Sequence, residues 1–340
     1  EEIEVTGSRI ARRDFTSASP IVSVPSTTFA ETGSVSVERT LAMLPQFVPT
    51  VTGTSNEPSN DGQANLSLRG IGVSQTLVLV DGKRLMPADG RGSVDLNVLP
   101  PALIEGVEVV TGGASAAYGS DAIAGVVNFR LRDEVDGIEF DADWSQAERG
   151  DGQEYSAGIL AGTSFDDGRG DVVAYVGYAE REQVNQGDRR HTKYPYIYYP
   201  DERNGYGPGG AFLGGGSGRT DDGYFVVFSN PAVFSQLFET YGYPQGSVPY
   251  FAGVGVNDDQ TVFTFGDDVT PGSVVNYRGE IDPVMYNDRL LTYNTAPLTA
   301  LQLPLERTSL YLRGQYQVSA SAEAYAQAIY ADYSATRQLP

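Results

Sequence analysis

Several residue types that support common kinds of protein chemistry are rare or missing in this chain of 340 residues. It has no cysteine, which excludes disulfides, cysteine zinc sites and a thiol nucleophile, and its one histidine, His191, has no second histidine for a metal pair. It carries 23 Lys and Arg against 44 Asp and Glu, a net charge of −21, so it lacks the basic surface that binds nucleic acid. We therefore expect neither a nucleic-acid partner nor a metal site.

Long hydrophobic runs are also missing, and the residues that are abundant indicate β-structure. No apolar stretch approaches the roughly 18 residues of a transmembrane helix, and the longest are short runs such as Thr76–Val80. The chain has 40 Gly, 21 Tyr and 14 Phe, against one Trp and three Met. A helical membrane protein is excluded. A membrane β-barrel is not, because its strands alternate apolar and polar residues and never give a continuous apolar signal.

No motif of an enzyme stands out. His191 lies in a polar loop, and the sequence contains no credible nucleophile elbow for which it could act as the base. The glycine-rich segment Gly112–Ser115 lacks the lysine of a phosphate-binding loop. Paired carboxylates such as Asp166 and Asp167 fit solvated turns, with calcium binding as the lesser alternative because the calcium-loop pattern is not met. We therefore expect no enzymatic activity and no cofactor.

The first part of the chain reads as an extended arm followed by a small α/β domain. Residues 1–19 are polar and cannot fold alone. Residues 20–132 contain a helix pattern at 36–44 that ends before Pro45, and a possible helical turn at 100–104. Before, between and after these two helical segments, the pattern predicts short strands at 21–24, 65–70, 76–80 and 106–110.

Residues 133–340 change to long alternating strands. In residues 138–144 the four even-numbered positions are apolar and the three odd-numbered positions are acidic, so one face of this strand needs water. Four more strands are predicted at 153–165, 171–183, 306–318 and 321–336. Two of the connections are tight, but one runs from about 184 to 304. Short turns at one end and long loops at the other are typical of membrane barrels, which makes 184–304 an external loop.

This external loop is rich in aromatic residues. A structureless loop of this length is rare, so it should be functional or folded on itself. The favoured interpretation is a folded lobe with an aromatic core. The alternative is direct contact with a flat ligand or a sugar, for which Tyr196, Tyr198 and Tyr199 are the candidates.

Three segments, in this order and spacing, closely resemble the plug domain of TonB-dependent outer-membrane receptors: Asn65–Gly70, Thr76–Arg84 and Ile104–Asn128. The resemblance implies an α/β plug domain followed by antiparallel strands of a transmembrane β-barrel of about 22 strands, of which about five are present here. The expected division is an arm at 1–19, a plug at 20–132 and barrel strands at 133–340. A barrel of that size needs several hundred residues, so we expect the N-terminal part of a longer receptor, or a piece of a barrel that a second chain completes.

The resemblance also implies roles for particular residues. The segment from Glu2 through Ile3, Glu4 and Val5 to Thr6 looks like a TonB box, which the inner-membrane energy-coupling protein recruits by strand addition. Arg69 is implied to tie the plug to glutamates on the barrel wall. Many relatives have Arg-Gly-Pro where this chain has Thr111–Gly113, so a second arginine of that ionic lock is missing.

The implied function is uptake of a scarce solute across the bacterial outer membrane, driven by the periplasmic domain of TonB, with outer-membrane lipid around the barrel. The substrate is a small solute or a glycan, and the plug loops at 52–64 and 85–94 are the candidates to face it. Their polar residues, with one that precedes the second loop, are Asn60, Asp61, Arg84, Asp89 and Arg91. The alternative function is a surface interaction protein, whose barrel is an anchor and whose aromatic loop docks another protein or polymer.

Overall fold

The structure, a computed structural model, describes residues 21–49, 62–112, 114–193, 196–199, 205–208, 211–212, 230–248, 253–257, 259–265, 274–278, 286–287, 290–293 and 296–336. Two compact units divide the chain: Glu1–Val184 with Ala300–Arg337, and Asn185–Thr299 with Gln338–Pro340. No helix in the described parts of the chain is long and apolar enough to cross a membrane.

The first unit begins with an α/β domain whose sheet has the order β1-β4-β5-β2-β3. Strand β2 pairs in parallel with β5, and the other pairings are antiparallel. All five residues of β2 are buried, as a continuous apolar run predicts for a strand covered on both faces. The strands are β1 (Ile21–Pro25), β2 (Thr76–Val80), β3 (Lys83–Arg84), β4 (Ile104–Val110) and β5 (Gly125–Leu131).

The helices of this domain are short: α1 (Ser26–Thr32), α2 (Val37–Leu41), α3 (Ser115–Tyr118) and the 3-10 turns η3 (Val73–Gln75), η4 (Leu96–Val98), η5 (Pro101–Leu103) and η6 (Ser120–Ala122). The predicted strand at 65–70 is wrong. There Leu68 makes an isolated bridge to Phe47, and its N–H donates to the Thr76 hydroxyl. Arg69 and Gly70 then take positive φ angles of 55° and 70°, which turn the chain away before a ladder can form.

Five long antiparallel strands form a second sheet in this unit, which we call the wall sheet. Its order is β20-β19-β8-β7-β6. In the turn from β7 to β8, Asp166, Asp167 and Gly168 all have positive φ. Its strands lie within a few residues of the predicted ones: β6 (Gly137–Ser145), β7 (Glu154–Phe165), β8 (Gly170–Arg181), β19 (Leu305–Ser319) and β20 (Ala322–Ser334).

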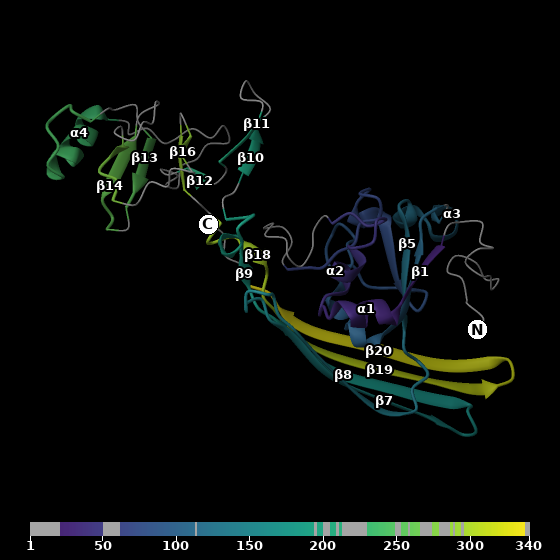
Figure 1. The fold of residues 1–340 in the computed structure, drawn as a ribbon. Coiled ribbons are helices and arrows are strands. Elements are labelled where there is room, and N and C mark those ends of the chain that lie inside the picture. The colour runs from purple at the N-terminus through teal and green to yellow at the C-terminus, as the bar shows by residue number, and fades with distance from the viewer. Residues whose placement is uncertain are drawn as a thin grey trace. The chain divides into compact units, whose positions relative to one another are not determined.

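The two faces of the wall sheet differ sharply. One row across the five strands joins exposed apolar side chains: Phe140, Ile159, Val176, Leu310 and Tyr330. The adjacent row points to the other face and joins Glu139, Leu160, Tyr175, Tyr311 and Ile329. The three middle residues of this second row are buried in the same core as the α/β domain. Figure 1 shows that domain over the concave face of the wall sheet. We call this the inner face, and the apolar one the outer face.

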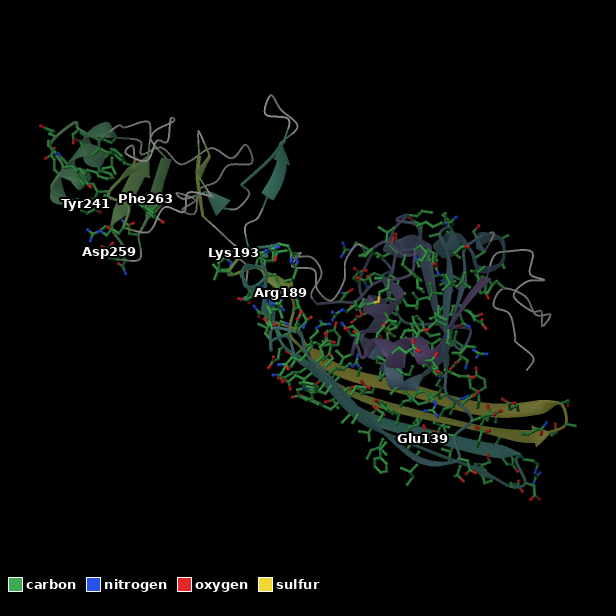
Figure 2. All side chains as sticks on the ribbon, in the orientation of Figure 1. Glu139, Arg189, Lys193, Tyr241, Asp259 and Phe263 are labelled. Atoms are coloured by element: carbon green, nitrogen blue, oxygen red, sulfur yellow. The ribbon has the colours of Figure 1, made fainter. Side chains whose placement is uncertain are left out.

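The second unit contains the segment predicted as an external lobe. Helix α4 (Pro231–Thr240) begins at Asn230, whose side chain accepts a hydrogen bond from the N–H of Ala232. Phe234 and Phe238 are buried, and the ring of Tyr241 packs edge-on against Phe238, as expected for a folded lobe. Figure 2 shows Tyr241 beside α4. The other helical and strand elements in and beside this segment are β9 (Val184–Asn185), η7 (Gln186–Asp188), β10 (Tyr196–Tyr199), β11 (Gly205–Pro208), β12 (Ala211–Phe212), β13 (Gly253–Val256), β14 (Val262–Phe265), β15 (Val274–Val275), β16 (Tyr286–Asn287), β17 (Leu290–Tyr293) and β18 (Ala300–Gln302).

Candidate functional site

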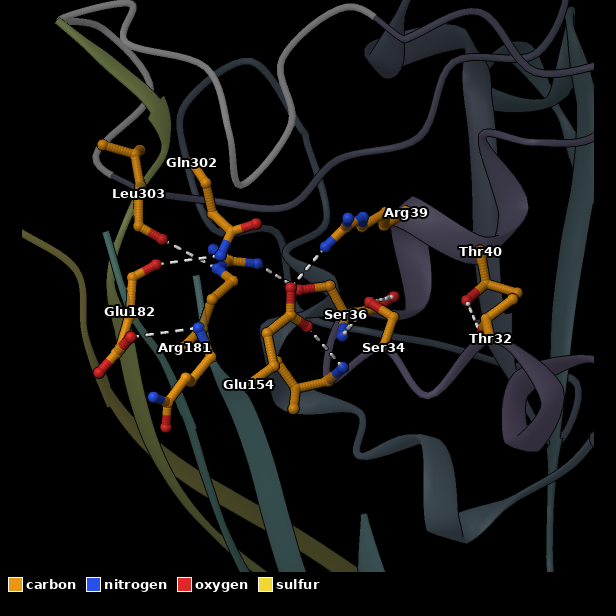
Figure 3. A network of polar contacts seen from close by, with 12 residues as sticks. Thr32, Ser34, Ser36, Arg39, Thr40, Glu154, Arg181, Glu182, Gln302 and Leu303 are labelled. Carbon is orange, nitrogen blue, oxygen red and sulfur yellow. Dashed lines mark hydrogen bonds and ion pairs between the residues drawn. The ribbon is translucent and has the colours of Figure 1, made fainter. Parts of the chain in front are cut away.

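Charged side chains join the α/β domain to the inner face of the wall sheet, close to the strand ends that lead into the long insertion. Glu154, at the start of β7, has a side chain only 4% exposed. One of its oxygens lies 2.5 Å from Nη1 of Arg39 on α2, and the other accepts a hydrogen bond from the N–H of Val35 at 3.3 Å (Figure 3). Because a buried carboxylate is costly without partners, these contacts hold the start of α2 against β7.

Two buried arginines of the wall sheet complete this contact. Arg181, at the end of β8, donates from Nη1 to the Ser36 hydroxyl at 2.5 Å and from Nε to the carbonyl of Leu303 at 2.8 Å (Figure 3). Arg307 on β19 is 3% exposed and donates to the carbonyl of Asn97 at 3.4 Å. The α/β domain and the wall sheet are therefore joined by charge-assisted bonds as well as by apolar packing.

A second set of contacts lies further along the same face. Gln327 on β20 donates to the carboxylate of Asp81 at 2.7 Å, and Lys83 lies 4.0 Å from the ring centroid of Tyr325. In the segment between the domain and β6, Asp133 pairs with Arg313 of β19 at 2.5 Å. The α/β domain thus contacts the wall sheet in two regions, around Glu154 and around Gln327.

Sequence reasoning missed Glu154, Arg181 and Arg307. The signal was present, because each is a charged residue at a position that the strand alternation assigns to the inner face. Arg69 is exposed and donates to the carbonyl of Ala124 at 2.8 Å, a contact inside the α/β domain. No ion pair between Arg69 and a glutamate occurs within the described residues, so the ionic lock stays a prediction.

The predicted ligand-facing residues that the structure describes are held by local partners. Arg84 pairs with Asp121 and donates to the carbonyl of Tyr118 at 2.7 Å. The Arg84 hydrogen bond lowers the pKa of the Asp121 carboxyl below its usual value. These bonds pin Arg84 beside η6.

Asp89 organises the loop that follows. Its carboxylate lies 3.0 Å from Nε of Arg91 and accepts from the N–H groups of Arg91 and Ser93. Burial raises the pKa of Asp89, but the hydrogen bonds from Ser93 and Arg91 outweigh it and lower the pKa to about 2. The loop at 85–94 is therefore ordered by its own charges before any ligand arrives.

The remaining candidates are placed only in part. Asn60, Asp61 and the box residues Glu2, Ile3, Glu4, Val5 and Thr6 lie outside the described residues. The three tyrosines Tyr196, Tyr198 and Tyr199 lie on β10, whose backbone pairs with β11. In the parts of the chain that the structure describes, no group of three or more His, Asp or Glu side chains is placed to hold a metal ion.

Comparison with known proteins decides what the α/β domain is. Residues 13–126 match the family described as the TonB-dependent Receptor Plug Domain. This segment is a TonB-dependent receptor plug domain. The plug occupies about a third of the chain, and the wall sheet follows it directly.

Solved structures extend the likeness to the wall sheet. One structure, a mutant of the ferric enterobactin receptor PfeA from Pseudomonas aeruginosa in complex with enterobactin, superimposes with a TM-score of 0.52 at 13% identity. A second variant of PfeA gives 0.50 at 14% identity. Each match covers 94% of this chain and 34% of the receptor, so the chain spans about a third of the length of the receptors it matches. At these identities the likeness shows the fold, a plug followed by antiparallel barrel strands, and it confirms the predicted fold class.

Proposed function

We propose that this chain belongs to a transporter that takes up a solute across the bacterial outer membrane by the TonB-dependent route. The observation that carries the proposal is the wall sheet with its two unlike faces. One has exposed apolar side chains along its middle, and the other is packed on a plug through apolar side chains and buried charged ones. A strand wall of this kind separates lipid from a lumen, and the plug fills the lumen.

The outer face supports a position in the membrane. Its middle carries apolar side chains, and at the end near the long insertion the hydroxyls of Tyr155 and Tyr178 both bond to Glu180. Tyrosines at the edge of an apolar band are typical of the membrane interface, where the ring meets lipid and the hydroxyl meets water. Outer-membrane lipid is therefore the partner of this face.

The N-terminal arm supports coupling to the periplasmic domain of TonB. It leads directly into β1, the edge strand of the plug sheet, so a partner that binds the arm acts on the plug at its edge. We assign the box to Glu2, Ile3, Glu4, Val5 and Thr6. Strand addition suits this segment, because an extended chain offers unpaired backbone groups and alternate side chains that select the partner.

The substrate is proposed as a small solute or a glycan that the external loops and the plug loops capture. Both matched structures are of a ferric enterobactin receptor, but identities of 13% and 14% do not transfer that ligand. In the plug loops, Asn60 and Asp61, together with Arg84, Asp89 and Arg91, supply polar contacts. In the lobe, Tyr196, Tyr198 and Tyr199 supply rings for stacking.

Binding to the purified periplasmic domain of TonB tests the proposal. Val5→Pro removes a backbone N–H from the box and should weaken binding at least tenfold, about 1.4 kcal/mol, because one strand-addition bond is lost and the extended segment is distorted. The matched control is Ala11→Pro, the same change behind the box. Equal binding by both variants and the unchanged chain, or no binding by any of them, contradicts TonB coupling.

The folded aromatic lobe favours a second candidate, a surface interaction protein that the barrel anchors. The packing of Phe234, Phe238 and Tyr241 shows that this region has a core of its own. If the chain shows no TonB binding, and deletion of the lobe abolishes binding of cells to a polymer or protein while solute uptake is unchanged, this candidate replaces the first.

A further inference from the structure

A cavity of about 670 Å³ lies between the plug and the inner face of the wall sheet. On the plug side it is lined by α1 and the segment around η5, and on the other side by β6, β7, β8 and β19. Its size is within the range of small-molecule sites, about 300–1,000 Å³. We call it the inner-face cavity.

Small residues on the wall sheet make room for this cavity. Two neighbouring rows run across its floor, Asp141-Gly158-Gly177-Ser309 and Asp143-Ser156-Ala179-Arg307. The ring of Tyr175 leans over Gly158 and Gly177, where any Cβ atom would collide with it. The four middle positions of the two rows carry no side chain larger than that of serine, which leaves space between the wall sheet and the plug.

The charges along the cavity are unevenly partnered. Both oxygens of Glu139 accept from Arg132 at 2.8 Å, and Glu105 lies 3.3 Å from Nη2 of Arg130, so these two carboxylates are neutralised. Asp141 and Asp143 line the cavity, and no ion pair of either is found within the described residues. At the far end of the second row lies one buried cation, Arg307. Two carboxylates therefore face one guanidinium across the floor, which leaves the cavity negative.

The uncharged lining consists of hydroxyls and ring faces. Ser26, Thr27 and Ser34 contribute hydroxyls from the plug side, and Ser156 and Ser309 contribute them from the wall sheet. The rings of Phe29 and Tyr175 also line it. Carboxylates and one arginine can exchange hydrogen bonds with a polyol, and rings stack on sugar faces. An anion in the cavity is instead repelled by Asp141 and Asp143, for which the described residues provide no ion-pair partner.

We propose that the inner-face cavity is a binding site inside the lumen for a hydroxyl-rich solute without negative charge, such as a short oligosaccharide. The proposal rests on the proposed uptake function for its biological sense and deepens it by naming the substrate class. It assigns the selection against anions to Asp141 and Asp143. Local fields of this kind change the concentration of a charged solute by about tenfold or more.

Because the chain has no cysteine, one introduced thiol can report which solutes reach the cavity. Ser156→Cys places it on the floor beside Asp143, and Gln245→Cys places a reference thiol at an exposed position of the lobe. Isolated outer membranes that contain the full-length chain are treated with three methanethiosulfonates, carrying a glucosyl, an aminoethyl and a sulfonatoethyl group. The rate of modification at residue 156 is divided by the rate at residue 245 for the same reagent, which cancels the intrinsic reactivity of that reagent. Comparing these normalised rates between reagents then cancels any shift in the pKa of the cavity thiol.

The glucosyl and aminoethyl reagents should modify the cavity thiol at least about tenfold faster than the anionic reagent. Adding Asp141→Asn and Asp143→Asn should reduce this preference to about twofold, whereas the matched control Asp171→Asn, a carboxylate of the inner face away from the cavity, should leave it unchanged. Equal rates for the three reagents, a thiol that none of them reaches, or the same preference after the double change would overturn the proposal. Modification of the cavity thiol does not require TonB. A failure of the proposed binding site can therefore be distinguished from a failure of the proposed TonB-dependent uptake.

Discussion

The inner and outer faces of the wall sheet have the same backbone and opposite surroundings. Along β8, Val176 on the outer face is 45% exposed, whereas Tyr175 on the inner face is 6% exposed. In a water-soluble protein the buried face of a sheet is the apolar one and the exposed face is polar. Here the middle of the exposed face is apolar, and the covered face carries buried charges, such as Glu154 and Arg307, beside its apolar residues. This is the order that lipid outside and a plug inside require.

The comparison also shows where sequence tolerance should lie. If the proposed function holds, outer-face residues need only be apolar, because lipid adapts to their shape. Inner-face residues meet a folded partner, so their size and their hydrogen bonds are fixed by particular neighbours. Changes matched in chemistry but placed on opposite faces should therefore have opposite consequences.

The largest difference is expected for an added charge. Val176→Arg places a cation in the middle of the outer face and should destabilise the inserted barrel by about 2–4 kcal/mol, because lipid cannot solvate it. The measurement is the fraction of chain in outer membranes that shows heat-modifiable migration on a gel. Ser164→Arg adds the same charge to the inner face opposite Asp171 and should change this fraction little. Similar losses in both variants would mean that the outer face does not meet lipid.

The second largest difference between the faces is expected when a single methyl group is added to a glycine on each of them. Gly177→Ala on the inner face places a Cβ against the Tyr175 hydroxyl and should cost about 1–3 kcal/mol of unfolding free energy through overpacking. Gly314→Ala, on the neighbouring strand and the outer face, has only the carbonyl of Asp171 near, at 3.8 Å, and should be close to neutral. Urea unfolding in detergent micelles measures both.

Tyr175→Ala provides the check on the overpacking explanation. In that background Gly177→Ala should lose most of its cost, because the atoms it meets are gone. An unchanged cost would place the strain in the backbone instead of in this contact.

The smallest difference concerns a carboxylate. Glu154→Gln replaces charge-assisted bonds to Arg39 and Val35 by neutral ones and should cost about 1 kcal/mol, the difference between the two kinds of hydrogen bond. Glu306→Gln, at an exposed outer-face position, should cost less than about 0.5 kcal/mol. Proteolysis of the plug in intact outer membranes reports the loss, and equal protection in both variants would argue against a role for Glu154 in holding α2.

Much of the wall sheet could be predicted from the sequence because alternation is a local property. Residues 138–144 show it without knowledge of any partner, and the strand lies at Gly137–Ser145. The segment at 65–70 shows the limit of this reasoning. It alternates equally well, but the Thr76 hydroxyl takes the N–H of Leu68, and a turn follows at once.

The site was less predictable because its partners are distant in the chain. The contact between Val35 and Glu154 spans 119 positions, and that between Arg307 and Asn97 spans 210. Strand parity could have pointed Glu154, Arg181 and Arg307 inward, but it could not have paired them with α2 or η4. Family resemblance pointed to Arg69 instead, whose contact in the structure lies within the plug.

The link between the plug and the first strand of the wall sheet sets a limit on how far the plug can travel. Strand β5 ends at Leu131 and β6 begins at Gly137, so only residues 132–136 connect them. Fully extended, five residues reach about 17 Å, and Val135 is buried in the shared core with its carbonyl over Gly162. Because this connection is short, the C-terminal end of the plug stays beside β6 and acts as a pivot. Any opening of the lumen must swing the plug about that point or unravel it from the other end, and cannot carry it away whole.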